Sequence, residues 1–259
     1  MRRFVRFRDE ARWDGLGSTS LARFGPPLAL YCELRGVSAA PLVLYGASGY
    51  AIATADVFES WVPEPLARVV AYIDDDRGDD RSSIAGAPII SFETWKSTYR
   101  DIPMFVTIGN PASRRKLVER VRAAGGRFAS FYRIAGNVAR DIVVGEGTMI
   151  LAYANVGAGT TIGNHVHVMP LASIDASCTV GDFTTFCPMS AVSGRVVIEE
   201  GVFVGVGARI VNQTDELMTI GAGATIAAGA VVLRSVLPGE TLVGNPATDF
   251  RSLAKQRFA

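Results

Sequence analysis

Histidine and cysteine are scarce in this chain, with two and three residues among 259. The cysteines Cys32, Cys178 and Cys187 are an odd set without metal-ligand spacing, which argues against a disulfide framework and favours a reducing compartment. A three-histidine metal site lacks its third ligand, because only His165 and His167 are present. We therefore expect no metal ion.

An excess of charge of one sign is also absent, since 26 Lys and Arg residues face 25 Asp and Glu residues and the net charge is +1. Such a balance offers no field that would draw the protein to nucleic acid or to an anionic membrane. No apolar run approaches the ~18 residues of a membrane span, and the N-terminus reaches Asp9 and Glu10 before any apolar run. We expect a cytoplasmic protein with neither nucleic acid nor membrane as partner.

Apolar residues recur at every sixth position through the second half of the chain. Steps of six from Val138 to Ile210 meet an apolar residue at each of thirteen positions. If about half of all residues are apolar, chance gives such a run roughly once in ten thousand trials. A repeat of six residues predicts a parallel β-helix, a coil in which each of three flat faces takes one repeat.

A second row of small or β-branched residues follows four positions after the apolar row, and we expect it to face inward too. Glycines such as Gly145 and Gly157 stand one step after the apolar residue, where they are expected to supply the permissive backbone of a tight corner. The register breaks after Ile210, so residues 212–216 are expected to loop out. The second row consists of Ala154, Thr160, Val166, Ala172, Cys178, Thr184, Ser190, Val196, Val202 and Ala208.

The preceding segment alternates strands and helices. Strands are expected over 41–45, 68–73 and 104–108, and helices over 50–60 and 112–124. This order predicts βαβ units with a parallel sheet, in which ligands bind at the carboxyl ends of the strands.

A glycine turn and a pair of acids fall at those strand ends. The turn fits a structural role as well as nucleotide binding, whereas the acids are able to accept hydrogen bonds from ribose or sugar hydroxyls. The candidate substrate-binding residues are Gly46, Ser48, Gly49, Tyr50, Asp74 and Asp75.

The chain therefore divides into an extension over 1–40, an α/β domain over 41–132 and a β-helix over 133–259. The extension interleaves arginines with aromatic residues such as Phe4 and Trp13. Aromatic and arginine side chains stack on nucleic-acid bases. A short segment without a fold of its own more often covers a neighbouring subunit or moves freely, and we assign it no role.

Four ordered motifs and the hexapeptide run together resemble one family. The motifs are Tyr-Gly-Ala-Ser-Gly at 45–49, Tyr-Ile-Asp-Asp-Asp at 72–76, Thr-Ile-Gly-Asn at 107–110 and Val-Gly-Asn-Pro-Ala at 243–247. Over about residues 41–250 the chain resembles bacterial hexapeptide-repeat sugar acetyltransferases of the sialic-acid O-acetyltransferase and bacillosamine or perosamine N-acetyltransferase type. The resemblance implies a Rossmann-like domain that holds a nucleotide-sugar, followed by a left-handed parallel β-helix. It also implies a homotrimer that takes acetyl-CoA in a groove between adjacent β-helices.

Small residues that would let the pantetheine arm of acetyl-CoA lie against backbone amides are present, although β-helix corners favour the same residue types. The candidate cofactor-binding residues are Gly194, Gly205, Val206, Gly207, Ala222, Gly223, Ala228, Gly244, Asn245 and Pro246.

The family's catalytic histidine is replaced here. Its position corresponds to Ala176, and the carboxylate position after it is Ser177. A family asparagine position corresponds to Met169, and a second histidine position to Thr185. Acyl transfer needs a group that takes the proton of the attacking amine or hydroxyl. The site has lost several of the family's polar groups together.

Three side chains offer substitutes for the missing base. His167 or His165 would act as a displaced base, or they are simply a corner contact and a turn residue. Cys187 would serve as a covalent acyl acceptor, although no neighbouring base is evident from the sequence.

The sequence thus supports two hypotheses. The first is an acyl-CoA-dependent acyltransferase with an altered active site that N-acetylates a nucleotide-linked amino sugar. N-acylation is favoured over O-acylation, because an amine that attacks while deprotonated needs less help than an alcohol. The alternative is a non-catalytic trimeric relative that binds these ligands or acts as a scaffold.

Overall fold

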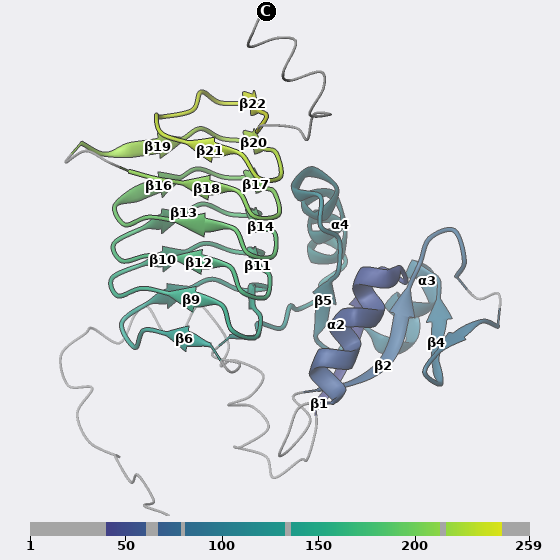
Figure 1. Ribbon diagram of the computed structural model, residues 1–259. Coiled ribbons are helices and arrows are strands. Elements are labelled where there is room, and N and C mark those ends of the chain that lie inside the picture. Colours follow the sequence, from purple (N-terminus) through teal and green to yellow (C-terminus); the bar gives the residue numbers. More distant parts are fainter. Residues whose placement is uncertain (1–39, 61–66, 79–80, 133–135, 213–215, 245–259) are drawn as a thin grey trace, which may run out of the picture.

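The computed structural model describes residues 40–60, 67–78, 81–132, 136–212 and 216–244 (Figure 1). It consists of an α/β domain and a three-faced β-helix that lie side by side. Among the described residues, no helix combines the length and the apolar character needed to cross a membrane. Residues 1–39, Asn245 and Pro246 lie outside the described part, so the predictions made for them are not addressed.

The α/β domain contains one five-stranded sheet with the order β3-β4-β2-β1-β5. All neighbours pair in parallel except β3 and β4, which pair antiparallel. The expected strands and helices are confirmed. They are β1 (Ala40–Tyr45), α2 (Gly49–Glu59), β2 (Ala67–Ile73), β5 (Met104–Val106) and α4 (Pro111–Ala123).

Strand β1 is an apolar run because both faces of the sheet are covered. Leu42 and Leu44 pack with Phe58 of α2 on one face. Val43 and Tyr45 belong to the core on the other face, which includes apolar residues of α4. Helix α4 begins where the Asn110 side chain accepts a hydrogen bond from the Ser113 backbone N–H, with Pro111 in its first turn.

The sequence reading missed the segment between β2 and β5. It contains β3 (Ser83–Ile84), β4 (Ala87–Ile90), a short helix α3 (Phe92–Thr94) and one π-helical turn η2 (Trp95–Tyr99). Strands β3 and β4 are joined by Ala85 and Gly86, which both have positive φ angles of 49° and 86°. Two residues of positive φ make the tight hairpin turn whose twist suits paired strands.

The second half of the chain forms three parallel sheets. The strands are two or three residues long, and residues 18 positions apart pair across neighbouring coils, as Thr161 does with Thr179. The first sheet has β7 (Val143–Val144), β10 (Thr161–Ile162), β13 (Thr179–Val180), β16 (Val196–Ile198) and β19 (Met218–Ile220). The second has β8 (Met149–Ile150), β11 (His167–Val168), β14 (Thr185–Phe186), β17 (Phe203–Val204), β20 (Thr225–Ile226) and β22 (Thr241–Leu242). The third has β6 (Asn137–Val138), β9 (Asn155–Val156), β12 (Ser173–Ile174), β15 (Ala191–Val192), β18 (Arg209–Ile210) and β21 (Val231–Val232).

Each coil turns three corners, which we name by their place along the chain. The first corner joins the first sheet to the second, as at 163–166 and 181–184. The second corner joins the second sheet to the third, as at 169–172 and 187–190. The third corner joins the third sheet back to the first, as at 175–178.

Both predicted inward rows are confirmed. The apolar row is buried at every position from Ile150 to Ile210, and all ten members of the second row are buried as well. The two rows form one continuous core along the coil. Each face buries one large and one small side chain, and this burial accounts for the six-residue period in the sequence.

The role expected for the corner glycines is wrong. Gly145 and Gly157 do not have a positive φ; the left-handed residue falls two positions later, at Gly147 and Gly159. A Cβ on Gly145 would instead lie 2.6 Å from the Gly163 carbonyl of the next coil. Close backbone contact between stacked coils, and not the turn itself, requires glycine there.

Helix α4 lies along the first corner of the β-helix (Figure 1). Arg122, near its end, pairs with Glu146, and Arg115, near its start, pairs with Glu200 at 3.0 Å. Because Glu146 and Glu200 stand on the first corner three coils apart, the helix runs antiparallel to the direction in which the coils advance.

Candidate active site

The glycine turn after β1 packs closely against Thr107, which directly follows β5. Gly46 has a φ of 119°, and a Cβ there would lie 2.7 Å from Thr107 Oγ1. Ser48 and Gly49 are exposed at the start of α2, and the Ser48 side chain makes no capping hydrogen bond. The first backbone N–H groups of an eleven-residue helix therefore remain available, and such groups favour anions.

Asp75 lies at the end of β2 and is already paired. Its carboxylate accepts hydrogen bonds from Arg120 at 2.8 and 2.9 Å and from the Tyr45 hydroxyl at 2.8 Å. Burial, followed by the hydrogen bond to Asp75, raises the pKa of Tyr45. The Arg120 guanidinium also lies 3.9 Å from the centre of the Phe92 ring.

Asp74 serves its own loop. Its Oδ1 accepts hydrogen bonds from the backbone N–H groups of Asp76 and Arg77 at 3.1 and 3.0 Å. The structure thus brings both acids to the predicted sheet edge with protein partners. Their contact with a substrate remains a prediction.

His167 lies in β11 under the α/β domain and is 1% exposed. Its Nδ1 is 2.9 Å from the Tyr50 hydroxyl, and its ring stacks on Phe105 at 5.1 Å between centroids. Its Nε2 is buried and has no hydrogen-bond partner among the described residues. Burial, then the charges of Arg114 and His165, hold the pKa of His167 well below its usual value, so the ring is neutral.

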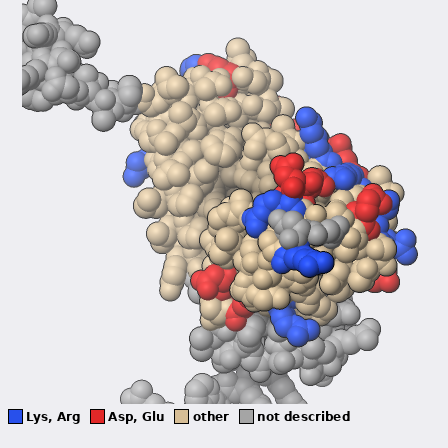
Figure 2. Space-filling view, turned by 90° about the vertical axis from the view of Figure 1, so that its right-hand side faces the viewer, with Lys and Arg blue, Asp and Glu red and all other residues tan. Residues whose placement is uncertain are grey.

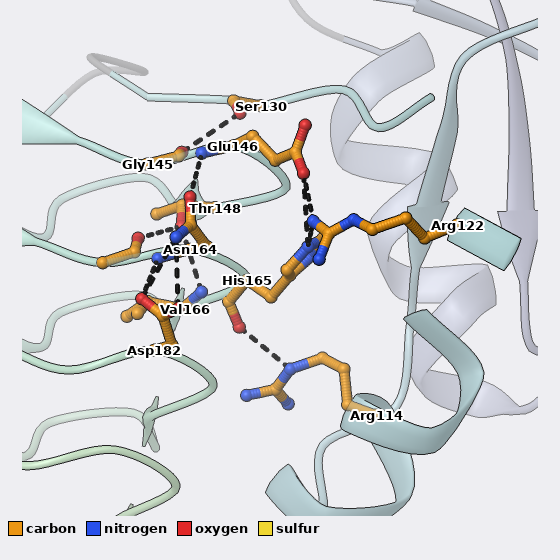
Figure 3. Close-up of polar contacts among 11 residues, drawn as sticks. Arg114, Arg122, Ser130, Gly145, Glu146, Thr148, Asn164, His165, Val166 and Asp182 are labelled. Carbon is orange, nitrogen blue, oxygen red and sulfur yellow. Dashed lines mark hydrogen bonds and ion pairs between the residues drawn. The ribbon is translucent and has the colours of Figure 1, made fainter. Parts of the chain in front are cut away.

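His165 stands on the first corner with a φ of 54° and is 2% exposed. Its ring stacks on Phe183 at 5.2 Å and meets Phe128 edge-on. The Nε2 atom lies 3.4 Å from Arg122, beside the Arg122–Glu146 ion pair (Figure 3). Burial, then Arg122 and Arg114, lower its pKa to about 3.

Neither imidazole therefore meets solvent in this conformation. Both rings contact the α/β domain of their own chain. The displaced-base role predicted for His167 and His165 requires a substrate to reach a covered ring, and it stays a prediction.

The four replaced family positions are spread over the β-helix. Ala176 and the exposed Ser177 lie on the third corner. Met169 lies on the second corner and packs against the core of the α/β domain. Thr185 lies in β14, where its hydroxyl donates to the Gly109 carbonyl at 2.8 Å. Within one chain, the Ala176 position does not meet the histidines.

The candidate cofactor residues are also distributed over different corners of the β-helix. Gly205, Val206, Gly207 and Ala228 stack on the second corner, and Gly244 follows β22 on the same side of the coil. Ala222 and Gly223 lie on the first corner, and Gly194 lies on the third. Val206 is 45% exposed, and a Cβ on Gly205 would lie 2.6 Å from the Ala228 backbone nitrogen. Five of the eight described residues thus line one edge of the β-helix.

Cys187 also lies on the second corner and is half-buried. Burial raises the pKa of its thiol, which disfavours the thiolate that acyl transfer to sulfur would need. Within the described ranges, no three His, Cys, Asp or Glu side chains gather as metal ligands. The expectation of no metal ion stays a prediction.

Arg114 was missed by the sequence reading. It is completely buried in α4 and contacts both domains. Its signal was present: Arg114, Val118 and Val121 share one face of the helix, and all three are buried. A charged residue on an apolar helix face marks a buried polar contact.

Comparisons with known proteins agree with this architecture. Residues 41–121 match the model of the PglD N-terminal domain. No curated protein sequence matches the chain. Among solved structures, a histidine-to-alanine variant of GDP-perosamine N-acetyltransferase from Caulobacter crescentus, in complex with CoA and GDP-perosamine, has a TM-score of 0.69 and 26% identity. The alignment covers 81% of this chain and 96% of that chain.

Two further structures are similar. The acetyltransferase domain of PglB from Neisseria gonorrhoeae, in complex with acetyl coenzyme A, has a TM-score of 0.67 and 26% identity over 82% of this chain and 100% of that chain. WeeI from Acinetobacter baumannii has a TM-score of 0.67 and 28% identity over 81% and 99%. The predicted fold, an α/β domain followed by a left-handed parallel β-helix, is confirmed.

Proposed function

Because the chain is a relative of the PglD-like sugar acetyltransferases, we propose that it transfers an acetyl group from acetyl-CoA to an amino group on a nucleotide-linked sugar. The observation that carries this proposal is that one alignment spans both domains: it covers 96% of a GDP-perosamine N-acetyltransferase and 81% of this chain. Nearly the whole of an enzyme that was solved with CoA and GDP-perosamine is therefore matched in a single alignment.

The second corner is the proposed acetyl-CoA site. Three successive coils carry very small side chains at this corner, so a ligand could lie directly against their backbone. The residues are Gly205, Gly207, Ala228 and Gly244. Val206 adds an exposed apolar contact at the same edge. A pantetheine arm has amide groups and an alkyl thioether, so it suits an edge of backbone amides and small apolar side chains.

The glycine turn is the proposed acceptor site. The start of α2 offers unpaired N–H groups to the diphosphate of a nucleotide-sugar, helped by the helix dipole. In this proposal Tyr50 borders the same turn, and Asp74 and Asp75 meet the nucleoside from the neighbouring strand end. Because Arg120 is already paired with Asp75, the two side chains would offer the nucleoside a hydrogen-bond acceptor and a hydrogen-bond donor side by side.

In the proposed reaction, a neutral, unprotonated amine attacks the thioester carbonyl directly. The carbon–nitrogen bond forms, the carbon–sulfur bond breaks, CoA leaves as the thiolate, and the amine proton passes to the thiolate or to solvent. Holding the two bound reactants in alignment lowers the activation free energy by several kcal/mol, even without a general base. His167 takes the proton instead only if a substrate reaches its covered ring, either at Nδ1 after Tyr50 moves away or at Nε2 in the tautomer whose Nδ1–H donates to Tyr50.

We further propose that the protein is a cytoplasmic homotrimer. Charged side chains crowd the α/β domain, whereas the adjoining surface of the β-helix carries few (Figure 2). On the second corner Tyr153, Leu171 and Met189 are 71%, 56% and 55% exposed in one stack. An exposed apolar stack of this kind marks a protein interface. Sedimentation equilibrium checks this, and a monomeric mass at micromolar concentration contradicts it.

Calorimetric titration with acetyl-CoA tests the donor site without the unknown sugar. We expect micromolar binding with one site per chain. Gly207→Trp would fill the second corner and should abolish binding, whereas Gly239→Trp, at another left-handed glycine with open surroundings, serves as the control. No heat at millimolar acetyl-CoA in the wild type would sink the transferase proposal.

A second candidate function is favoured by one observation, the alanine at position 176. A non-catalytic relative would bind both ligands without transfer. The solved relative with a histidine replaced by alanine holds CoA and GDP-perosamine, so a protein of this fold is able to bind both ligands without that histidine. Ala176→His decides between the two: a large gain in CoA release from a silent wild type supports a non-catalytic protein, and an active wild type excludes it.

A further inference from the structure

We propose that Arg114 is a positioning residue that locks the α/β domain, and with it the acceptor site, in fixed register with the β-helix. This inference rests on the proposed function for its consequence in catalysis. Its structural basis is independent of that function.

Arg114 donates hydrogen bonds in two directions, and Figure 3 draws the one to the His165 carbonyl. Toward its own domain, it reaches the carbonyls of Ile108 and Gly109 at 2.6 and 3.2 Å. Toward the β-helix, it reaches the His165 carbonyl at 3.0 Å and the Phe183 carbonyl at 2.6 Å. The planar guanidinium thus spans two consecutive coils at the first corner.

These two carbonyls have a particular need of a donor. His165 and Phe183 are the left-handed residues of their corners, with φ angles of 54° and 61°. Among the described residues, no backbone N–H donates to either carbonyl oxygen. At an open corner water satisfies such a group, but here the α/β domain covers both residues. Leaving a buried carbonyl without a hydrogen-bond partner destabilises the fold, and Arg114 supplies a donor to both of these carbonyls.

The cation itself is held without a counter-ion. In the part of the chain that the structure describes, no carboxylate lies within ion-pair distance of Arg114, and its partners are carbonyls and the Thr185 hydroxyl, which accepts from Nη2 at 2.9 Å. Burial lowers its pKa to about 10, so it stays charged at neutral pH. A lysine has one compact ammonium and does not span the same set.

The contacts continue from Arg114 to the acceptor site. The carbonyls that it holds belong to residues 108 and 109, directly after Thr107. Thr107 Oγ1 donates to the Tyr45 carbonyl at 2.9 Å and lies against Gly46. Thr185 of the β-helix also donates a hydrogen bond to the Gly109 carbonyl. Movement of Arg114 therefore moves the glycine turn relative to the second corner, where we place acetyl-CoA.

The test compares Arg114→Met with Arg115→Met. Arg115 is the next residue and also crosses the domain contact, but it is half-buried, pairs with the exposed Glu200 at 3.0 Å and has its guanidinium 4.4 Å from the centre of the Phe183 ring. Methionine keeps an apolar contact with that ring, so Arg115→Met removes one partly exposed ion pair and leaves the hydrogen bonds of Arg114 in place. With an active wild type, we expect Arg114→Met to lower kcat by about tenfold to a hundredfold, because a misplacement of about 1 Å has effects of that size. KM for acetyl-CoA should stay within about twofold, since that site lies within the β-helix. Arg115→Met should change neither, and Arg114→Lys should fall between.

A distance measurement tests, without an activity assay, whether Arg114 fixes the two domains relative to each other. Spin labels at Lys96→Cys and Val231→Cys report on the two domains, with the three native cysteines replaced by alanine. Because we propose a homotrimer, labelled chains are mixed with an excess of unlabelled protein, so that only the distance within one chain is measured. We expect one narrow distribution of that distance, which Arg114→Met broadens and Arg115→Met does not. A wild type that transfers no acetyl group would refute the proposed function and leave this readout intact.

Thr185→Val provides a second variant should Arg114→Met fail to fold. It removes one acceptor of Arg114 and one donor to Gly109 with little change in shape, and it should broaden the distribution less. Unchanged distances and kcat in Arg114→Met, or equal changes in Arg115→Met, would overturn the proposal.

Discussion

The first and second corners of the β-helix have the same backbone and opposite surroundings. His165 and Phe183 on the first corner have φ angles of 54° and 61°, and Leu171 and Met189 on the second have 63° and 60°. Yet the first pair is 2% and 6% exposed, and the second pair is 56% and 55% exposed. The hexapeptide repeat determines the conformation of a corner, whereas burial depends on what the rest of the chain places over it.

This difference separates two kinds of surface on one repeat. The first corner is occupied by its own α/β domain, through α4, and its polar groups are paired there. The second corner is open in the single chain and carries both the apolar stack and the residues proposed for acetyl-CoA. Ligands and neighbouring copies therefore have the second corner available, and the first serves to hold the two domains together.

The largest effect is expected from truncating equivalent residues on the two corners. Phe183→Ala should lower the free energy of unfolding by about 3–4 kcal/mol, as for a buried aromatic residue, and Met189→Ala by less than about 1 kcal/mol. Both changes place alanine at a positive φ, so that cost cancels. Urea unfolding at protein concentrations at which the chain is monomeric measures both, because Met189 belongs to the stack proposed for the trimer interface. Equal losses in the monomer would contradict the difference between the two corners.

Acid should act on the covered corner through its two histidines. The folded pKa of His165 is lowered to about 3 and that of His167 well below 6.5, while both lie near 6.5 in the unfolded chain. The unfolded state therefore binds more protons below pH 6.5. The free energy of unfolding should fall as pH drops from 6.5 toward 3, by up to about 1.4 kcal/mol per pH unit for each histidine.

Unfolding by urea at a series of pH values measures this slope. His165→Asn is the matched variant, because asparagine tolerates the left-handed backbone, and it should remove the contribution of His165 and leave that of His167. A free energy of unfolding that stays constant between pH 7 and pH 5 would contradict buried, neutral histidines.

A smaller effect is expected from the contact between Tyr50 and His167. Tyr50→Phe leaves both ring nitrogens of the buried His167 without a partner and should lower the free energy of unfolding by about 1–2 kcal/mol. Tyr153→Phe, whose side chain is 71% exposed in the single chain, is the control and should change nothing measurable at protein concentrations at which the chain is monomeric. A Tyr50→Phe protein as stable as the wild type would indicate that the hydroxyl contact is absent in solution.

The repeat made most of the fold predictable from the sequence. One large and one small inward residue per six positions predict a three-faced coil, and in that coil every sixth residue from Ile150 to Ile210 is buried. The βαβ strands were predictable because β1 is apolar on both faces. The hairpin of β3 and β4 was missed because its strands are only two and four residues long. The glycines were placed correctly but explained wrongly, since the contact between coils is not visible in a single repeat.

The candidate site was less predictable because it is made by contacts between distant residues. Arg114 and the His165 carbonyl are 51 positions apart, and Tyr50 and His167 are 117 apart. Nothing local to residues 165–167 reveals that a helix covers them. The chain's two histidines therefore suggested displaced bases, while the structure shows both rings as part of the domain contact. Their role in catalysis stays a prediction.

The most direct test of the account is a transfer assay with purified protein, acetyl-CoA and a set of nucleotide-linked amino sugars, followed by thiol release and product mass. We predict CoA release that depends on one amino sugar, a product that gains one acetyl group on nitrogen, and a rate that rises with pH without an inflection near 6.5, as expected when neither histidine titrates there. Binding of acetyl-CoA with no transfer to any of the sugars would contradict the proposed activity.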